Sequence, residues 1–183
     1  MSCALIAALL GTGLTGCVTS GSAGSAPADT PIRTVAFTDG GQIMTTVPSG
    51  DRATFAATPE RMLRAVEGAY RDIGVEPTTV NVETRQVGNS AFVRRRQLGS
   101  VPLSRYFDCG NTFIGLRADD DRLTITMLST ITDAGGGKAE VRTVASAVAK
   151  PMDGTQTLPA DCASSGRLEQ LLRTAITKQL AAP

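Results

Sequence analysis

The chain has 183 residues, with 18 Lys and Arg residues against 17 Asp and Glu residues, which gives a formal net charge of +1. This balance excludes a strongly basic nucleic-acid-binding protein, so we expect no nucleic-acid partner. Hydrophobic residues make up 42% of the chain, which suffices for one core of ordinary size. The chain has no His, which removes most of the common catalytic and metal-binding arrangements, and we expect no catalytic centre, metal or other cofactor.

An uninterrupted apolar run from Ala4 to Leu10 is followed by small residues. The run is too short to span a bilayer, which needs about 20 apolar residues. A short apolar segment that ends at small residues is typical of a cleaved export signal. The tetrapeptide Leu14-Thr15-Gly16-Cys17 then resembles the lipobox of bacterial lipoproteins. The resemblance implies a signal peptide at residues 1–16, a diacylglyceryl group on the Cys17 thiol and an acylated amino terminus.

The segment Met1-Ser2-Cys3 departs from the lipoprotein pattern because it has no Lys or Arg. The alternative is a buried amino-terminal helix with Cys17 as an ordinary thiol. The thirteen residues from Val18 to Thr30 are small and polar, so residues 17–31 are expected to form a flexible tether with a reach of about 20 Å. Because Val18 and not Asp follows the cysteine, resemblance to enteric lipoproteins implies the outer membrane, facing the periplasm of a diderm host.

Two cysteines remain after Cys3 leaves with the signal and Cys17 is acylated. They are Cys109 and Cys162, and in an oxidising compartment such a pair is expected to form a disulfide. They lie 53 residues apart, for which the chain-entropy model gives a stabilisation of about 4 kcal/mol. A metal or redox pair is the competing interpretation, and it is disfavoured because the chain has no His and no Cys-x-x-Cys motif.

The folded region is expected to begin with a hairpin. Two β-prone runs, Ile32 to Thr38 and Gln42 to Val47, are separated by Asp39-Gly40-Gly41, so we expect them to pair antiparallel. A helix is expected next, because Thr58-Pro59-Glu60 combines a capping side chain, Pro at the first position and an acid at the positive helix end. Gly74 is its expected stop. The apolar face of this helix recurs at helical spacing through Met62, Leu63, Ala65, Val66, Ala69, Tyr70 and Ile73.

Three further strands are expected from alternating patterns. Thr78 to Val87 reads as one half-buried strand, and Ser90 to Val93 either continues it or pairs with it. Arg122 to Thr132 and Ala139 to Lys150 are expected to form a long hairpin with Asp133 to Gly137 as its flexible tip. The apolar faces consist of Val80 and Val82 in the first strand and of Leu123, Ile125, Met127 and Ile131 in the second.

A carboxy-terminal helix is expected to begin near Ser164 or Ser165. The order of elements predicts an α+β fold for residues 32–183, as one domain. We expect a two-layer sandwich in which an antiparallel β-sheet carries two main helices on one face. In that arrangement the disulfide would fix the last helix to the sheet. The apolar stripe of that helix consists of Leu168, Leu171, Leu172, Ala175, Ile176 and Leu180.

The most concentrated positive charge is Arg94-Arg95-Arg96. On a membrane-tethered domain such a run is a candidate surface for anionic headgroups, lipopolysaccharide phosphates or an acidic protein. The alternative is a solvated loop that like charges keep extended. Tyr106 and Phe107, beside Cys109, form a second candidate contact surface, and the alternative is that their rings pack in the core around the crosslink.

No pattern of acids or hydroxyls indicates catalysis. Asp119-Asp120-Asp121 lacks the ligand spacing of an EF-hand loop and is expected to be a charged turn. Ser164-Ser165-Gly166 is expected to be a helix start, because a Ser-His pair is impossible without His.

These patterns lead to a functional hypothesis of a non-catalytic, lipid-anchored envelope protein. It would contact the membrane through its anchor and act as a binding or assembly module for another envelope component, most simply a protein. One alternative is a lipoprotein that holds a lipid or glycan between sheet and helices. A second is a cell-wall hydrolase that works without His, for which two carboxylates at a set separation would be needed.

Overall fold

The computed structural model describes residues 32–36, 42–46, 50–113, 115–152 and 158–182. The expected signal peptide, Cys17 and the tether lie outside the described residues. No helix in the described ranges is long and apolar enough to cross a membrane. The first two strands, β1 (Ile32–Ala36) and β2 (Gln42–Thr46), pair antiparallel in a two-stranded sheet, which confirms the expected hairpin.

The rest of the described chain forms one open antiparallel sheet with two long helices. The strand order is β7-β6-β5-β9-β10-β11-β8, with β4 also paired to β5 and β3 also paired to β10. The elements in chain order are β3 (Asp51–Phe55), α1 (Pro59–Asp72), β4 (Thr79–Asn81), β5 (Gln86–Arg95), β6 (Gln97–Leu98), β7 (Val101–Pro102), the 3-10 turn η1 (Leu103–Arg105), β8 (Phe107–Asp108), α2 (Arg117–Asp120), β9 (Arg122–Gly135), β10 (Lys138–Lys150), β11 (Ala160–Ser164) and α3 (Arg167–Ala181).

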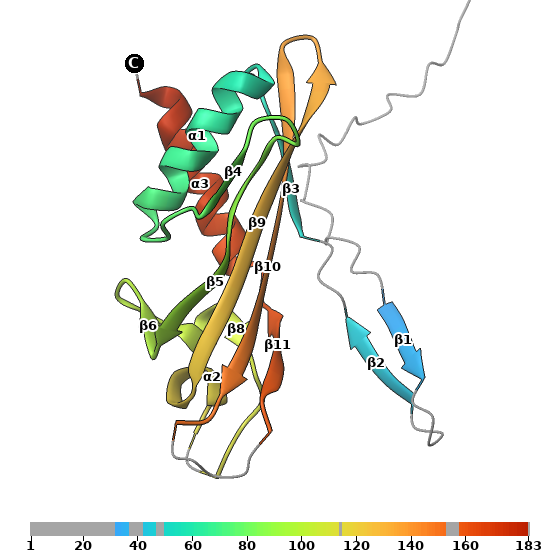
Figure 1. Ribbon diagram of the computed structural model, residues 1–183, viewed down its shortest axis with the longest axis vertical. Coiled ribbons are helices and arrows are strands. Elements are labelled where there is room, and N and C mark those ends of the chain that lie inside the picture. The colour runs from blue at the N-terminus through green and yellow to red at the C-terminus, as the bar shows by residue number, and fades with distance from the viewer. Residues whose placement is uncertain (1–31, 37–41, 47–49, 114, 153–157, 183) are drawn as a thin grey trace, which may run out of the picture.

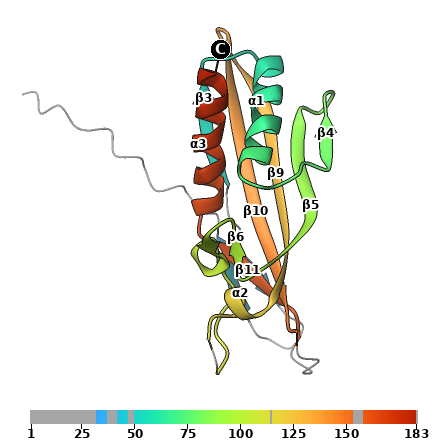
Figure 2. The same ribbon diagram turned by 90° about the vertical axis from the view of Figure 1, so that its left-hand side faces the viewer.

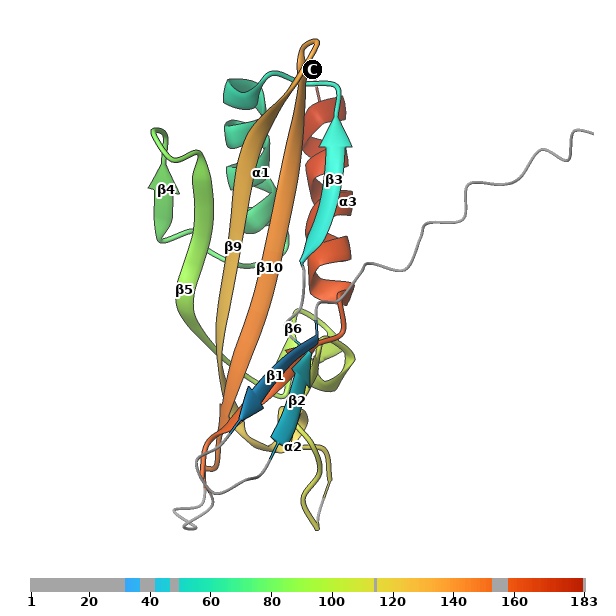
Figure 3. The ribbon, with the colours of Figure 1, turned by 90° about the vertical axis from the view of Figure 1, so that its right-hand side faces the viewer.

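The two layers of the expected α+β sandwich are present. Helices α1 and α3 lie side by side on one face of the sheet, as Figures 1 and 2 show from two directions. The paired strands β9 and β10 run along the full length of the sheet, whereas the helices cover only about one half of that length (Figure 1). On the far edge of β10, strand β3 pairs with residues 139–143 and β11 with residues 147–149, one after the other (Figure 3).

Helix α1 forms where the sequence predicts it. The Thr58 hydroxyl accepts a hydrogen bond from the Arg61 amide at 3.4 Å, and Pro59 occupies the first turn. Gly74, at φ +76°, follows the last turn and takes the left-handed conformation that ends many helices. The apolar face is buried, and Met62, Val66, Ala69 and Tyr70 are all 0% exposed. This helix therefore owes its position to the burial of one continuous face.

The expected long strand at residues 78–87 is wrong. The structure has a hairpin there, in which β4 pairs with the start of β5 and the chain turns between Asn81 and Gln86. The Asn81 side chain accepts a hydrogen bond from the Thr84 amide at 2.9 Å, and Arg85 takes φ +52°. Val82 is therefore 70% exposed rather than on a buried face. A side chain that bonds a nearby backbone amide favours a turn over continued pairing.

The hairpin of β9 and β10 is confirmed. The inner face of these two strands forms the sheet side of the hydrophobic core. Residues of odd number in both strands point toward the helices and those of even number point away, as the period of two requires. The expected apolar residues of β9 are all buried, at 2% exposure or less. Ser129 and Thr143 face each other on the same inner side, and both are buried. The sheet therefore carries a polar pair inside its apolar layer.

The carboxy-terminal helix begins later than expected. Ser164 ends β11, and α3 begins at Arg167 after Gly166, which takes φ +77°. The Ser164 hydroxyl accepts a hydrogen bond from the Gly166 amide at 3.1 Å, so this serine shapes the turn that precedes the helix. The sequence pattern does not predict β11 or β3, because both are five-residue strands without a strong apolar alternation.

Candidate functional site

The disulfide between Cys109 and Cys162 is present, with an S–S distance of 2.03 Å and a Cα–Cα distance of 4.2 Å. Cys162 lies in β11, and Cys109 directly follows β8, which pairs with β11. The crosslink therefore joins two neighbouring strands at the edge of the sheet. The expectation that it fixes the last helix to the sheet holds only indirectly, because β11 is connected to α3 by two residues.

The crosslink lies in the half of the sheet that the helices do not cover. We call this region the loop end, and define it by β8, α2, β11 and the described parts of the loops at residues 109–116 and 151–159. The described residues of the loop at 109–116 extend beyond the ends of the long strands in Figures 1 and 3. A hollow of about 420 Å³ beside the disulfide is lined by Ser104, Phe107, Asp108, Cys109, Gly110, Asn111, Leu116 and Ala118.

Tyr106 and Phe107 do not form an exposed contact surface, and the alternative interpretation, that the rings pack in the core around the crosslink, holds. Tyr106 is 6% exposed and Phe107 is 1% exposed, because both rings pack into the core beneath the loop end. The Tyr106 carbonyl accepts a hydrogen bond from the Ser165 amide at 2.9 Å, which holds this segment against the connection to α3. Burial raises the pKa of the Tyr106 hydroxyl.

The run Arg94-Arg95-Arg96 does not act as one patch. Arg94 lies on the helix side of the sheet, where its guanidinium stacks on the Phe92 ring at 5.3 Å and donates a hydrogen bond to the Gly74 carbonyl at 2.8 Å. That contact places a cation at the negative end of α1. Arg95 points to the opposite face, and Arg96 turns the chain at φ +62°. The three side chains therefore separate because a strand alternates its faces.

Arg95 instead joins two cations that the sequence does not place beside it. It lies directly opposite Arg122 of β9, and Arg122 lies directly opposite Lys150 of β10. Opposed residues of neighbouring strands point to the same face. Arg95, Arg122 and Lys150, which we call the cation row, are all exposed on the sheet face away from the helices. Within the described part of the chain, none of the three forms an ion pair.

Large apolar side chains are exposed on the two loops of the loop end. Phe113 is fully exposed, and Leu158 is 80% exposed. Leu116 and Met152 are about half exposed, at 49% and 47%. Since soluble domains bury most large apolar residues, a concentration of them on neighbouring loops indicates a contact surface. We call these four residues the apolar tip.

Polar contacts fix the position of both loops. Arg117 forms a partly buried ion pair with Asp121 at 2.9 Å, and it also donates a hydrogen bond across to the Leu158 carbonyl at 3.2 Å. The turn at residues 112–115 is closed by the Thr112 amide, which donates to the Gly115 carbonyl at 2.8 Å. The expected charged turn at residues 119–121 is in fact the end of α2, where Asp119 accepts from the Ser104 amide at 2.9 Å. The apolar tip thus stands on an ordered base.

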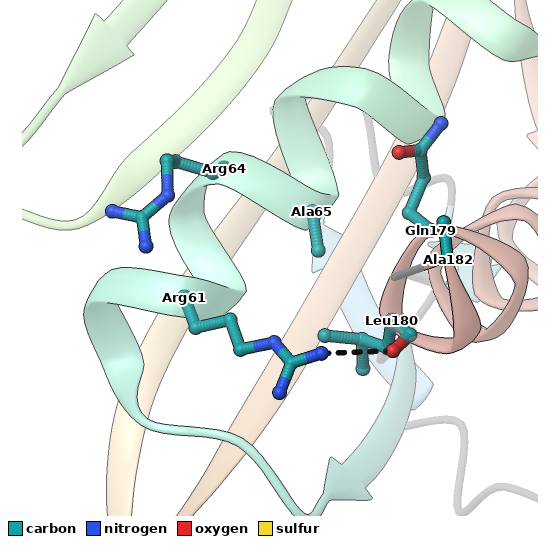
Figure 4. A pocket seen from close by; sticks show the side chains of 6 residues that line it. All are labelled: Arg61, Arg64, Ala65, Gln179, Leu180 and Ala182. Carbon is teal, nitrogen blue, oxygen red and sulfur yellow. Dashed lines mark hydrogen bonds between the residues drawn. The ribbon is translucent and has the colours of Figure 1, made fainter.

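A second hollow, of about 290 Å³, lies between α1 and α3. Its cations are already engaged or turned away, because Arg61 donates a hydrogen bond to the Leu180 carbonyl at 3.0 Å and Arg64 points away from α3 (Figure 4). Gln179 reaches across to Asp72 at 2.9 Å and passes over Gly68, where a Cβ atom would come within 2.9 Å of its side chain. These contacts explain how the two helices pack closely. They do not indicate a ligand.

Buried polar groups lie between the helices and the sheet. The Tyr70 hydroxyl is hydrogen-bonded to Ser129 at 3.1 Å, and Ser129 is hydrogen-bonded to Thr143 at 2.8 Å. Glu169, at 1% exposure, accepts hydrogen bonds from the Ser164 hydroxyl at 2.7 Å and from the Ala145 amide at 3.3 Å. Desolvation raises the pKa of the Tyr70 hydroxyl and of the Glu169 carboxyl. Each group has a partner, so this set joins the two layers.

The described residues contain no group of three or more His, Cys, Asp or Glu side chains that could hold a metal ion. The sequence patterns also do not single out the apolar tip or Glu169. The sequence does contain a feature that could have identified the apolar tip. Phe113 directly follows the turn-forming residues Gly110-Asn111-Thr112, and large apolar residues are unusual in such a segment. The burial of Glu169 leaves no such signal, because it occupies an ordinary position near a helix start.

Sequence comparisons assign no family to this chain. No protein-family model matches it, and no curated protein matches it. The interpretation of the loop end therefore depends on the exposed side chains, charges and crosslink described above.

Proposed function

We propose that this chain is a lipid-anchored protein of the cell envelope, which faces the periplasm and binds another envelope component without catalysing a reaction. The observation that carries the proposal is the occurrence of a lipobox-like Cys17 and of the Cys109–Cys162 disulfide in one chain. Acylation at a lipobox and disulfide formation both take place outside the reducing cytoplasm. We place the protein at the outer membrane, because Val18 and not Asp follows Cys17.

The loop end is the binding surface in this proposal. Its exposed apolar side chains adjoin the cation row, which forms no ion pair with any residue that the structure describes, and the disulfide and Arg117 hold its base. A binding site needs such a rigid support, because ordering a mobile surface costs affinity.

The alternative of a ligand held between sheet and helices receives less support. The described side chains in that interface contact one another, and Tyr70, Met127 and Leu172 are each 0% exposed. A lipid or glycan would have to separate the layers and break the Tyr70–Ser129 hydrogen bond. Co-purification of a lipid or glycan with the protein, without any contact at the loop end, would favour this alternative instead.

The anchor is tested by replacing the acylated cysteine in cells. Cys17→Ser is expected to abolish labelling of the protein by a radioactive fatty acid, because the acylated thiol is gone. Cys3→Ser is the matched control, because Cys3 is expected to leave with the signal, and it should keep the label. A Cys17→Ser variant that keeps its label would contradict the proposal.

A further inference from the structure

We propose that the loop end inserts into the surface of an anionic lipid bilayer, with the apolar tip entering the interface and the cation row lying against the headgroups. The inference rests on the proposed function for the location of the protein, and it names the envelope component as the bilayer itself.

The first support is the chemistry of the loop at residues 111–116. Asn111 and Leu116 form an isolated antiparallel bridge, and Thr112 and Gly115 close the turn between them. A tight turn exposes its central residues, which are usually Gly, Pro, Asn, Asp or Ser. Here Phe113 occupies such a position and is fully exposed, while Leu116 follows the turn. An aromatic ring held out at the end of a closed turn has no role in the core and is placed to enter an apolar medium.

The second support is the clustering of exposed apolar side chains near the same end. The apolar tip supplies four of them, and Val93 and Val148 add two on the outer face of the sheet, at 47% and 40% exposure. These two valines flank Thr124 in the row of opposed residues next to the cation row. Asp161 of β11 lies directly opposite Val148 on the same face and is exposed, so the three cations of the cation row there stand against one acid. The outer face near the loop end is therefore apolar with a net positive charge, which suits an interfacial membrane contact.

The cation row supplies the charge complementarity. Like charges placed directly opposite on neighbouring strands repel each other, so the row costs stability in water. An anionic surface removes that cost and attracts each cation within a Debye length. Two acids, Asp108 and Asp120, lie beside the 110–116 loop, so the positive charge comes from the sheet face. We therefore expect the domain to tilt, with the outer face turned toward the headgroups.

The shape of the surface favours a bilayer over a protein partner. The loop at residues 109–116 protrudes (Figure 1), and Leu158 belongs to a separate segment, whose carbonyl accepts a hydrogen bond from Arg117 at the start of α2. A protein interface needs complementary shape over a broad patch, whereas a fluid bilayer adapts to separate protruding side chains. The hydrogen bond from the Thr112 amide to the Gly115 carbonyl lies within the first loop, so insertion of Phe113 does not break it.

The absence of Trp from the sequence permits a local probe of this surface. The full chain carrying Cys17→Ser and Phe113→Trp is mixed with vesicles of phosphatidylglycerol and phosphatidylcholine, or of phosphatidylcholine alone. The matched control carries Val82→Trp, which places the probe in the exposed turn between β4 and β5, away from the loop end (Figure 3). Binding of the apolar segment at residues 4–10 alone would bring both probes to the vesicle surface, so the test is the difference between the two probes.

We expect the Phe113→Trp emission to shift to shorter wavelength with anionic vesicles and to be quenched by brominated acyl chains, with little change at Val82→Trp. Neutral vesicles or high salt should weaken the shift. No shift at Phe113→Trp, or an equal shift at Val82→Trp, would overturn the inference. A shift that follows protein concentration without vesicles would overturn it in favour of contact between copies, and a shift that requires an envelope protein would favour a protein partner.

The cation row is tested by a variant whose folding and binding should change in opposite directions. Arg122→Thr removes the central charge and places a good strand former there, so we expect a higher melting temperature and a loss of anionic-vesicle affinity of about fivefold. Affinity that stays unchanged in this stable variant would overturn the role of the row. The anchor is tested separately by Cys17→Ser in cells, so failure of one proposal is distinguishable from failure of the other.

Discussion

The two halves of the sheet are stabilised in different ways. In the helix-covered half, which consists of α1, α3 and the sheet residues beneath them, long elements bury continuous apolar faces. At the loop end, β8 has two residues and α2 has four, and a disulfide, an ion pair and side-chain hydrogen bonds to the backbone hold them. Large apolar side chains are buried in the first region and exposed on the loops of the second.

This difference indicates that the helix-covered half provides stability and that the loops of the loop end are available for binding. Burial holds the helix-covered half together, so its apolar residues are not available to a partner. The crosslink and polar contacts hold the loop end with little burial of its loops, which leaves Phe113 and Leu158 free to contact something else. Changes in the first region should therefore affect folding, and changes on the loops should affect binding.

The largest expected effect is the loss of the crosslink that holds the loop end. Cys109→Ala combined with Cys162→Ala should lower the free energy of unfolding by about 4 kcal/mol, because the unfolded chain regains the entropy of a 53-residue loop. Urea denaturation without reductant measures the difference, and the wild-type protein with reductant is the control. An unchanged unfolding midpoint would mean that burial alone holds the loop end.

The next effect is a cavity in the helix-covered half. Leu172 of α3 is 0% exposed, so Leu172→Ala should lower the free energy of unfolding by about 2–5 kcal/mol. Its neighbour Leu171 is 38% exposed, and Leu171→Ala should cost less than about 0.5 kcal/mol. Thermal unfolding of both variants checks the pair, and equal costs would show that the helix does not bury the face described.

A smaller effect is expected from the buried hydroxyl network. Tyr70→Phe removes one of the two hydrogen-bond partners of Ser129 and should cost about 1–2 kcal/mol, because the helix layer loses a buried hydrogen bond to the sheet. Tyr106→Phe is the matched control, since the Tyr106 hydroxyl makes no hydrogen bond with the described residues. Chemical denaturation of the two variants measures the contrast, and similar losses would argue against the network.

The smallest effect is a pH dependence at Glu169. Desolvation raises the pKa of this carboxyl, so the native state binds its proton more tightly than the unfolded state does. Stability should therefore fall as the pH rises from the ordinary Glu pKa through the raised one. Glu169→Gln should remove this slope in urea unfolding midpoints. Ser164→Ala removes a hydrogen bond that lowers the pKa, so it should extend the slope to higher pH, and identical slopes in all three proteins would contradict the assignment.

The helix-covered half could be predicted from the sequence because its elements repeat. The spacing of Met62, Val66 and Tyr70 predicts α1, and the alternation from Leu123 to Ile131 predicts β9. The disulfide followed from cysteine count and compartment. The α+β sandwich followed from the order of these elements.

The loop end could not be predicted in the same way, because its elements are too short to show a period. The strand alternation that separates Arg94 from Arg95, and the pairing that brings Arg122 and Lys150 beside Arg95, depend on register. Register is set by tertiary pairing rather than by local pattern. The burial of Tyr106 and Phe107 follows from the same packing.

The separation of folding from binding can be tested on one set of samples. Anionic-vesicle affinity and the free energy of unfolding are measured for Phe113→Asp with Leu158→Asp and for Leu172→Ala. We predict that the loop variant loses about tenfold or more in vesicle affinity with nearly unchanged stability, and that Leu172→Ala loses stability but keeps its affinity while folded. A loop variant that binds vesicles as well as the wild-type protein would contradict the account.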